Sequence, residues 1–301
     1  MSLSKEELEY YRKAGQIASK VRKAVPNIVE PGKKILEVCE EIENMILKMG
    51  GKLAFPCNIG INEVTAHFTP LGNNSELIPD GSVVKIDLGV HLSGYIADTA
   101  ITIPFNPAYE SMILAAEDAL RNAIENIKPG IKISDIGHII EKNITRHGYK
   151  PIRNLTGHKI ERFSLHCGKV IPNIAQINGA KIENGEVFAI EPFATYVDAS
   201  GIVKNNQEAY IFKYNKEKGT KSKKAIKLLR HIRNEFITLP FTTRWLESLY
   251  PEPELQNYLN EILSSRCIIP YHVLVEESHK PVAQAEHTVI VNEDGCEVLT
   301  L

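Results

Sequence analysis

Residues Gly81–Thr102 read GSVVKIDLGVHLSGYIADTAIT, a pattern that predicts two β-strands joined by a short polar turn. Asp87 lies on the first strand and Asp98 on the second. If Val90 pairs with Tyr95 across a four-residue loop, the two aspartates stand directly opposite each other, with Cβ atoms about 5 Å apart. A different register, which would leave one aspartate in solvent, is the alternative.

Two ionised carboxylates at that distance repel each other, and aspartate is depleted from strands. The predicted pairing of Asp87 and Asp98 therefore requires a shared proton or a compensating cation. A divalent metal ion is the compensation that this pattern favours.

Length and composition bound the class of protein. The chain has 301 residues, enough for one large domain or a domain with an insertion, and a formal net charge of −2 from 35 basic and 37 acidic residues. This balance gives no global reason to expect DNA or membrane binding. The five cysteines contain no Cys-x-x-Cys pair, and the charged N-terminus resembles neither a signal peptide nor a membrane span. We therefore expect a cytoplasmic protein.

An internal repeat relates the two halves of the chain. Residues 78–87, IPDGSVVKID, match residues 182–191, IENGEVFAIE, as a turn followed by a strand that ends in an acid. Each copy is preceded by two predicted helices with similar Pro-Gly punctuation, PGKKILEV at 31–38 and PGIKISDI at 129–136. The repeat predicts two halves about an approximate two-fold axis, with Glu191 in the place that corresponds to Asp87. Chance similarity is the alternative.

The repeat pattern breaks between residues 207 and 270. This stretch holds the basic run Lys213–Arg233, with nine Lys or Arg, and a polar helix predicted over 252–264. We predict an inserted helical subdomain at 207–270, between the first part of the main domain (1–206) and its C-terminal strands (271–301). The basic run is either a solvated helix face or a docking surface for RNA or the ribosome.

Three further residues join the aspartates as candidate metal ligands. Glu191 ends a predicted strand, Glu286 lies inside the apolar strand predicted over 283–291, and His158 follows a glycine-bearing turn. Four carboxylates and one imidazole form a hard, oxygen-rich set that suits two first-row divalent ions. Taken singly, Glu286 could instead face solvent and His158 could be an ordinary packed histidine.

These five residues, in this order and within these local sequences, resemble the metal ligands of the methionine aminopeptidases. The segments LAFPCN (53–58) and AHFTP (66–70), and the insertion with its TLPF and RWL motifs, resemble the type 2 branch in its short archaeal form. The resemblance implies the pita-bread fold, an α+β architecture of two pseudo-two-fold halves around a curved antiparallel sheet. It also implies two divalent metal ions, drawn from Co, Mn, Fe, Zn and Ni.

The implied activity is removal of the N-terminal methionine from nascent polypeptides whose second residue is small, through attack of a metal-bridging hydroxide on the first peptide bond. By resemblance, Asp98 and Glu286 bridge the two metals and Asp87 chelates one of them. His158 and Glu191 complete the other, and Glu191 also moves a proton.

The resemblance also implies the residues that contact substrate. His67 and His166 would hydrogen-bond the substrate, and the apolar slot for methionine would be formed by Phe55, Leu165, Phe193 and Tyr271. A monomer is expected. The competing interpretations are an X-Pro aminopeptidase or prolidase, and a non-catalytic pita-bread relative that binds RNA or protein.

Overall fold

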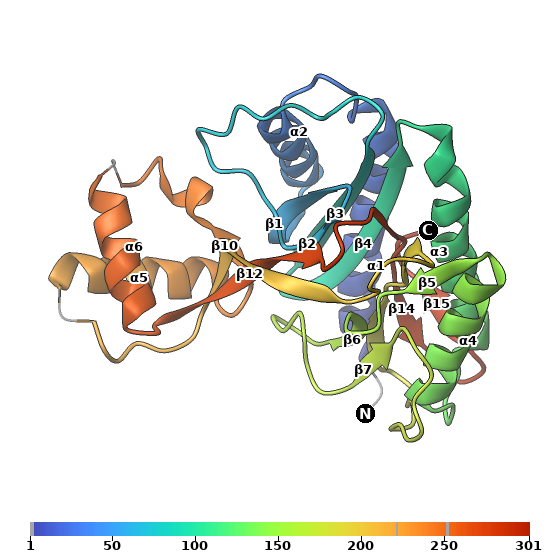
Figure 1. Ribbon diagram of the computed structural model, residues 1–301. Coiled ribbons are helices and arrows are strands. Elements are labelled where there is room, and N and C mark those ends of the chain that lie inside the picture. Colours follow the sequence, from blue (N-terminus) through green and yellow to red (C-terminus); the bar gives the residue numbers. More distant parts are fainter. Residues whose placement is uncertain (1–2, 221, 251–252) are drawn as a thin grey trace.

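The computed structural model describes residues 3–220, 222–250 and 253–301, and it has the predicted α+β architecture (Figure 1). The helices are α1 Lys5–Ala24, α2 Ile35–Lys48, α3 Glu110–Asn126, α4 Ile133–Arg146, α5 Lys223–Phe236 and α6 Glu254–Ser264, with short 3-10 turns η1 Val25–Asn27, η2 Pro107–Tyr109 and η3 Thr243–Leu246. The strands are β1 Lys52–Ile61, β2 Val64–Ala66, β3 Val83–Leu92, β4 Tyr95–Pro104, β5 Tyr149–Pro151, β6 Thr156–Ile160, β7 Val170–Pro172, β8 Val187–Ile190, β9 Phe193–Tyr196, β10 Val203–Tyr214, β11 Phe241–Thr242, β12 Ile268–Glu276, β13 Val282–Gln284, β14 His287–Val291 and β15 Cys296–Val298. In the described part of the chain, no helix combines the length and the apolar character that crossing a membrane requires.

The two halves of the main domain are built alike. In the first half, α1 and α2 bury one apolar stripe each against β1 and β3, with Ile42 packed near Ile59 and Ile86. In the second half, α3 and α4 do the same for the second set of strands, and their core includes Ile140 and Phe188. Each half therefore hides one side of its strands under a helix pair.

Matching hydrogen bonds confirm the predicted repeat. Before α2, the Gly32 N–H donates to the Ile78 carbonyl and the Ile78 N–H donates to the Lys33 carbonyl, both at 2.9 Å. Before α4, Gly130 and Ile182 repeat this exchange at 2.8 Å, with Ile131 as the second acceptor. In both halves the Pro-Gly turn that starts the second helix is therefore tied to the segment that leads into the acidic strand.

The β3–β4 hairpin forms, but the predicted register is wrong. Leu92 pairs with Tyr95 across a two-residue turn, Ser93-Gly94, in which both residues have positive φ (52° and 91°). Such a turn suits a tight hairpin, so the loop is two residues shorter than predicted. Asp98 consequently faces Gly89, and Asp87 faces Ala100. Since side chains alternate with period two, a shift of two residues leaves both aspartates on one face.

The segment that contains the basic run projects from the main domain on two long paired strands, β10 and β12 (left in Figure 1). Helices α5 and α6 pack on these strands around a core of their own. The predicted boundaries at 206/207 and 270/271 fall inside the two strands, so the division stays a prediction. Residues 221 and 252, part of the predicted basic run and polar helix, lie outside the described residues.

Candidate metal centre

The five predicted ligands come from four separate parts of the fold. Asp87 and Asp98 lie on the β3–β4 hairpin and His158 lies on β6. Glu191 follows β8 directly, in the break before β9. Glu286 occupies the corresponding break between β13 and β14. Since β13 pairs with β9 and β14 pairs with β8, these two breaks lie side by side.

The prediction that Glu286 lies inside one continuous strand is wrong. The strand pattern stops at Gln284 and resumes at His287, because the chain leaves the sheet of β9 for the sheet of β8. At the break the Glu286 N–H donates to the carbonyl of Ala100 on β4 at 3.3 Å. The backbone of Glu286 is thereby hydrogen-bonded to β4, the strand that carries Asp98.

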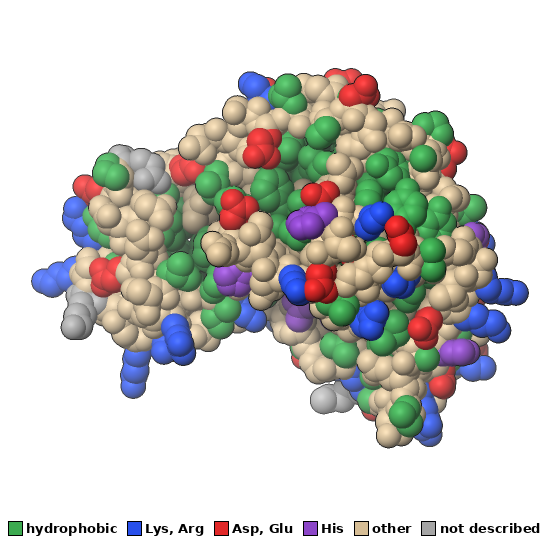
Figure 2. Space-filling model, in the orientation of Figure 1, with side chains coloured by type: hydrophobic (Ala, Val, Ile, Leu, Met, Phe, Trp, Pro, Cys, Tyr) green, Lys and Arg blue, Asp and Glu red, His purple; other side chains and the backbone are tan. Residues whose placement is uncertain are grey.

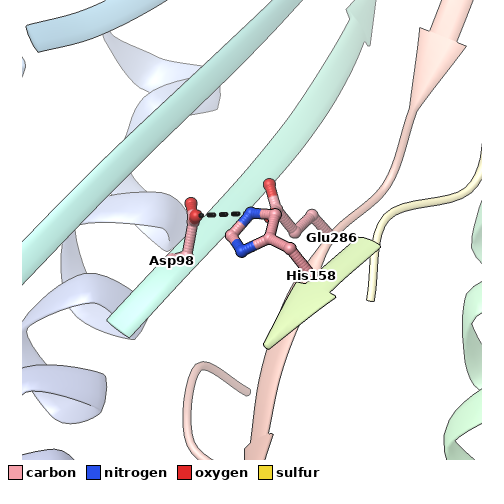
Figure 3. Close-up of side chains that lie close together, drawn as sticks. All are labelled: Asp98, His158 and Glu286. Carbon is pink, nitrogen blue, oxygen red and sulfur yellow. Dashed lines mark ion pairs between the residues drawn. The ribbon is translucent and has the colours of Figure 1, made fainter. Parts of the chain in front are cut away.

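Three of these side chains form a compact cluster (Figure 3). One ligand atom from each of Asp98, His158 and Glu286 lies within 4.8 Å of the other two. The Nε2 atom of His158 lies 3.6 Å from Asp98 Oδ2 and 3.5 Å from Glu191 Oε1. These separations are too long for hydrogen bonds.

Burial disfavours the charged forms of the four carboxylic acids among the predicted ligands. It raises the pKa of Asp87 to about 7, and it raises the pKa values of Asp98, Glu191 and Glu286 well above the ordinary range, with a further increase from neighbouring carboxylates. Among the described residues, Asp87 Oδ1 and Asp98 Oδ1 have no hydrogen-bond partner. Burial also lowers the pKa of His158 to about 4, so this imidazole is neutral at pH 7 and able to bind a metal. Unpartnered carboxylate oxygens around a neutral imidazole fit a divalent cation.

A cavity of about 200 Å³ opens onto the cluster. Every residue predicted to bind metal or substrate contributes to its lining, namely Phe55, His67, Asp87, Asp98, His158, Leu165, His166, Glu191, Phe193, Tyr271 and Glu286. The cavity is also lined by residues that the sequence pattern did not single out, among them Asn58, Asn154, Thr156, Ile211 and Pro240. Asn58 lies in the quoted segment LAFPCN, Pro240 lies in TLPF, and Asn154 and Thr156 closely precede His158, which was the available signal.

The two other cavity histidines are also neutral. His67 has positive φ (64°), and its Nδ1–H donates to the His272 carbonyl at 3.2 Å, which leaves Nε2 as an acceptor. Burial lowers its pKa to about 4. The His166 ring lies 4.1 Å from the His158 ring, centroid to centroid, and burial together with that neighbour lowers the pKa of His166. Both imidazoles can therefore accept hydrogen bonds at neutral pH.

Comparison with known proteins agrees with this geometry. Residues 9–293 match the model of metallopeptidase family M24. The methionine aminopeptidase of Methanothermobacter thermautotrophicus is 46% identical over 97% of this chain and 98% of its own, and that of Methanocaldococcus jannaschii is 44% identical over 98% and 99%. A solved structure of a thermophilic Arx1, at 21% identity, shares the fold with a TM-score of 0.85 and covers 99% of this chain and 91% of its own. The architecture is the pita-bread fold. The chain belongs to metallopeptidase family M24, and within it resembles archaeal methionine aminopeptidases over nearly its whole length.

Proposed function

We propose that this chain is a methionine aminopeptidase that removes the N-terminal methionine from nascent polypeptides whose second residue is small. The observation that carries the proposal is the convergence of Asp98, His158 and Glu286 on a cavity that Asp87 and Glu191 also line. Relatives with that name match nearly the whole chain at 46% and 44% identity.

The five predicted ligands would hold two divalent ions, which could be Co, Mn, Fe, Zn or Ni. In the assignment that the resemblance implies, Asp98 and Glu286 would hold both ions, Asp87 would hold one of them, and His158 and Glu191 would hold the other. When bound, such ions lower the pKa of water toward neutrality and polarise a carbonyl group.

The chain's own residues position the substrate and move protons. The free Nε2 of His67 can accept the N–H of the scissile peptide, because its Nδ1 is committed to the His272 carbonyl. His166, whose ring lies beside that of His158, can contact the substrate from another side of the cavity. Glu191 can take a proton and return it, since burial and the neighbouring Asp87 raise its pKa well above the ordinary value of a glutamate.

The wall of the cavity fits an unbranched apolar side chain. Phe55, Leu165 and Phe193 are buried, and Tyr271 contacts His67 edge to face at 5.3 Å between ring centroids. A methionine side chain adapts to such a slot, whereas a charged side chain would lose hydration without gaining a partner. Each methylene contributes only about 1–3 kcal/mol of discrimination, so norleucine should also be accepted.

A contact between the basic run and the ribosome is a weaker part of the proposal. Lys and Arg side chains lie around the outer edge of the projecting segment that contains α5 and α6 (Figure 2). On α5, however, Arg230 and Arg233 both pair with Glu217, and Lys224 pairs with Glu254. These pairs favour a solvated helix face.

A monomer in the cytoplasm is also proposed, and the five cysteines form no disulfide.

The test is methionine release from a Met-Ala-Ser peptide by chelated protein to which Mn, Co or Fe is returned. Release should depend on added metal and should be lost in His158→Ala and in Asp98→Ala. Retained turnover in either variant contradicts the metal assignment. Cleavage of X-Pro peptides in place of Met-Ala-Ser would favour the prolidase interpretation, and absence of turnover with every metal would favour a binding protein.

A further inference from the structure

A lysine is buried beside the metal centre without an acidic partner. Lys85 lies on β3, two residues before Asp87, and its side chain is 1% exposed. Its Nζ donates to the carbonyl of Asn62 and to the carbonyl of Val282, both at 2.9 Å. Among the described residues, no carboxylate lies within ion-pair distance of this ammonium group. Burial lowers the pKa of this amine to about 7, nearby Glu63 raises it in part, and the two carbonyl acceptors favour its charged form.

The surrounding backbone is shaped to hold this side chain. Gly60 stands directly opposite Lys85 on β1, and a Cβ atom there would lie 2.5 Å from the Val64 carbonyl oxygen and 2.8 Å from Lys85 Cε. Asn62 adopts positive φ (51°), and its side-chain Oδ1 accepts the Val83 N–H at 3.1 Å. The glycine thus makes room for the lysine stem, and the turn holds the Asn62 carbonyl beside the ammonium group.

The two carbonyls belong to parts of the chain that carry different metal ligands. Asn62 directly follows β1, which pairs with β3, the strand that carries Asp87. Val282 begins β13, which pairs with β9 just after Glu191 and leads to Glu286. The Asn62 carbonyl also accepts the Val282 N–H at 3.1 Å. Lys85 therefore sits where the hairpin of the two aspartates meets the strands of the two glutamates.

We propose that Lys85 is a positioning residue whose ammonium group acts as a built-in monovalent cation, holding β13 against the Asp87 strand and so fixing the spacing between the aspartates and the glutamates of the metal centre. The inference rests on the proposed metal centre. The carbonyl oxygens of Asn62 and Val282 both point at the ammonium group of Lys85, so they repel each other once that group is removed. Strand β13, and Glu286 with it, would then move away from Asp87.

Chemical rescue distinguishes this role from ordinary packing. In Lys85→Ala the two carbonyls remain and the space of the ammonium group is empty, so a small cation can enter. Calorimetric titration with Mn²⁺ in a tetramethylammonium buffer should show about 10-fold to 100-fold weaker affinity than in the wild type, the range for residues that orient metal ligands. Adding ammonium or methylammonium should restore most of the affinity, whereas more tetramethylammonium should not.

Two further variants control the experiment. Lys85→Met fills the volume of the stem without the charge, so it should bind Mn²⁺ weakly and should not respond to ammonium. Lys20→Ala, at an exposed position on α1, should match the wild type. The inference is overturned if Lys85→Met binds Mn²⁺ as tightly as the wild type does. It is also overturned if Lys85→Ala folds but ammonium fails to restore its Mn²⁺ affinity. Wild-type protein that binds no Mn²⁺ overturns the proposed function together with the inference, whereas an unchanged Lys85→Met overturns the inference alone.

Discussion

The hydroxyl of Thr288 bonds both backbone groups of Asp98. It accepts the Asp98 N–H at 2.8 Å and donates to the Asp98 carbonyl at 2.7 Å. A second threonine links the same two segments from the other side: Thr99 Oγ1, on β4, donates to the Glu286 carbonyl at 2.7 Å. Threonine side chains thus connect β4, which carries Asp98, to the segment that carries Glu286.

Replacing Thr288 with valine should destabilise the metal-free protein by about 1–3 kcal/mol, because the isosteric side chain leaves a buried N–H and a buried carbonyl without partners. Mn²⁺ affinity should fall as well, since Asp98 loses its support. Urea unfolding and calorimetric titration measure the two effects. Thr288→Ser keeps the hydroxyl and is the matched control. If the valine variant unfolds and binds metal as the serine variant does, the two hydrogen bonds contribute nothing.

Replacing Asp98 with asparagine should have opposite effects on stability and on metal binding. Burial and the neighbouring Asp87 carboxylate raise the pKa of Asp98, so the charged form is disfavoured in the metal-free fold. A neutral amide of the same shape removes this penalty, and the metal-free variant should gain about 1 kcal/mol or more. Thermal unfolding in chelator should show a higher midpoint than in the wild type, while Mn²⁺ should no longer raise it. A lower midpoint in chelator would mean that the carboxylate stabilises the fold without metal.

The resemblance of local segments to a known family was sufficient to predict the fold class, and the predicted site residues all line one cavity. The β-branched residues of both arms and the turn residues Ser93-Gly94 predicted the β3–β4 hairpin, and the repeated turn-strand-acid pattern predicted that Glu191 corresponds to Asp87. The side on which a strand residue lies depends only on its parity. For that reason both aspartates share a face even though the predicted register was wrong by two residues.

The register of the hairpin and the features that depend on contacts between distant segments could not be predicted. The turn closed at Ser93-Gly94 because both residues adopt positive φ, which the residue types permit but do not require. The break at Glu286 arises where the chain passes from one sheet to another, and an apolar run does not reveal that crossing. The carbonyl partners of Lys85 are 23 residues before it and 197 residues after it.

Replacing Arg244 with methionine should loosen the contact between the projecting segment and the main domain. Its guanidinium donates to both carboxylate oxygens of Glu43, at 2.9 Å each, and Glu43 is only 5% exposed. Loss of the arginine leaves this carboxylate buried without its counter-charge, held by the Cys57 N–H and the Trp245 Nε1–H, a change that costs up to about 3–5 kcal/mol. The variant should unfold at correspondingly lower urea concentration. Adding Glu43→Gln should recover part of the loss, and a double variant no more stable than Arg244→Met would show that the unpaired charge is not the cause.

His91 should make the protein less stable in acid. Its Nδ1 accepts the Gly94 N–H at 3.1 Å, and burial, with a smaller effect from Lys52, lowers its pKa from 6.5 to about 4. The unfolded chain therefore takes up this proton first as the pH falls. The stabilising contribution is complete above pH 6.5 and is lost as the pH falls through about 4. Between pH 7.5 and 4.5, the unfolding free energy of the wild type relative to His91→Gln should fall by roughly 2–3 kcal/mol. The other histidines titrate alike in both proteins and cancel, so a pH-independent difference would mean that folded His91 keeps its ordinary pKa.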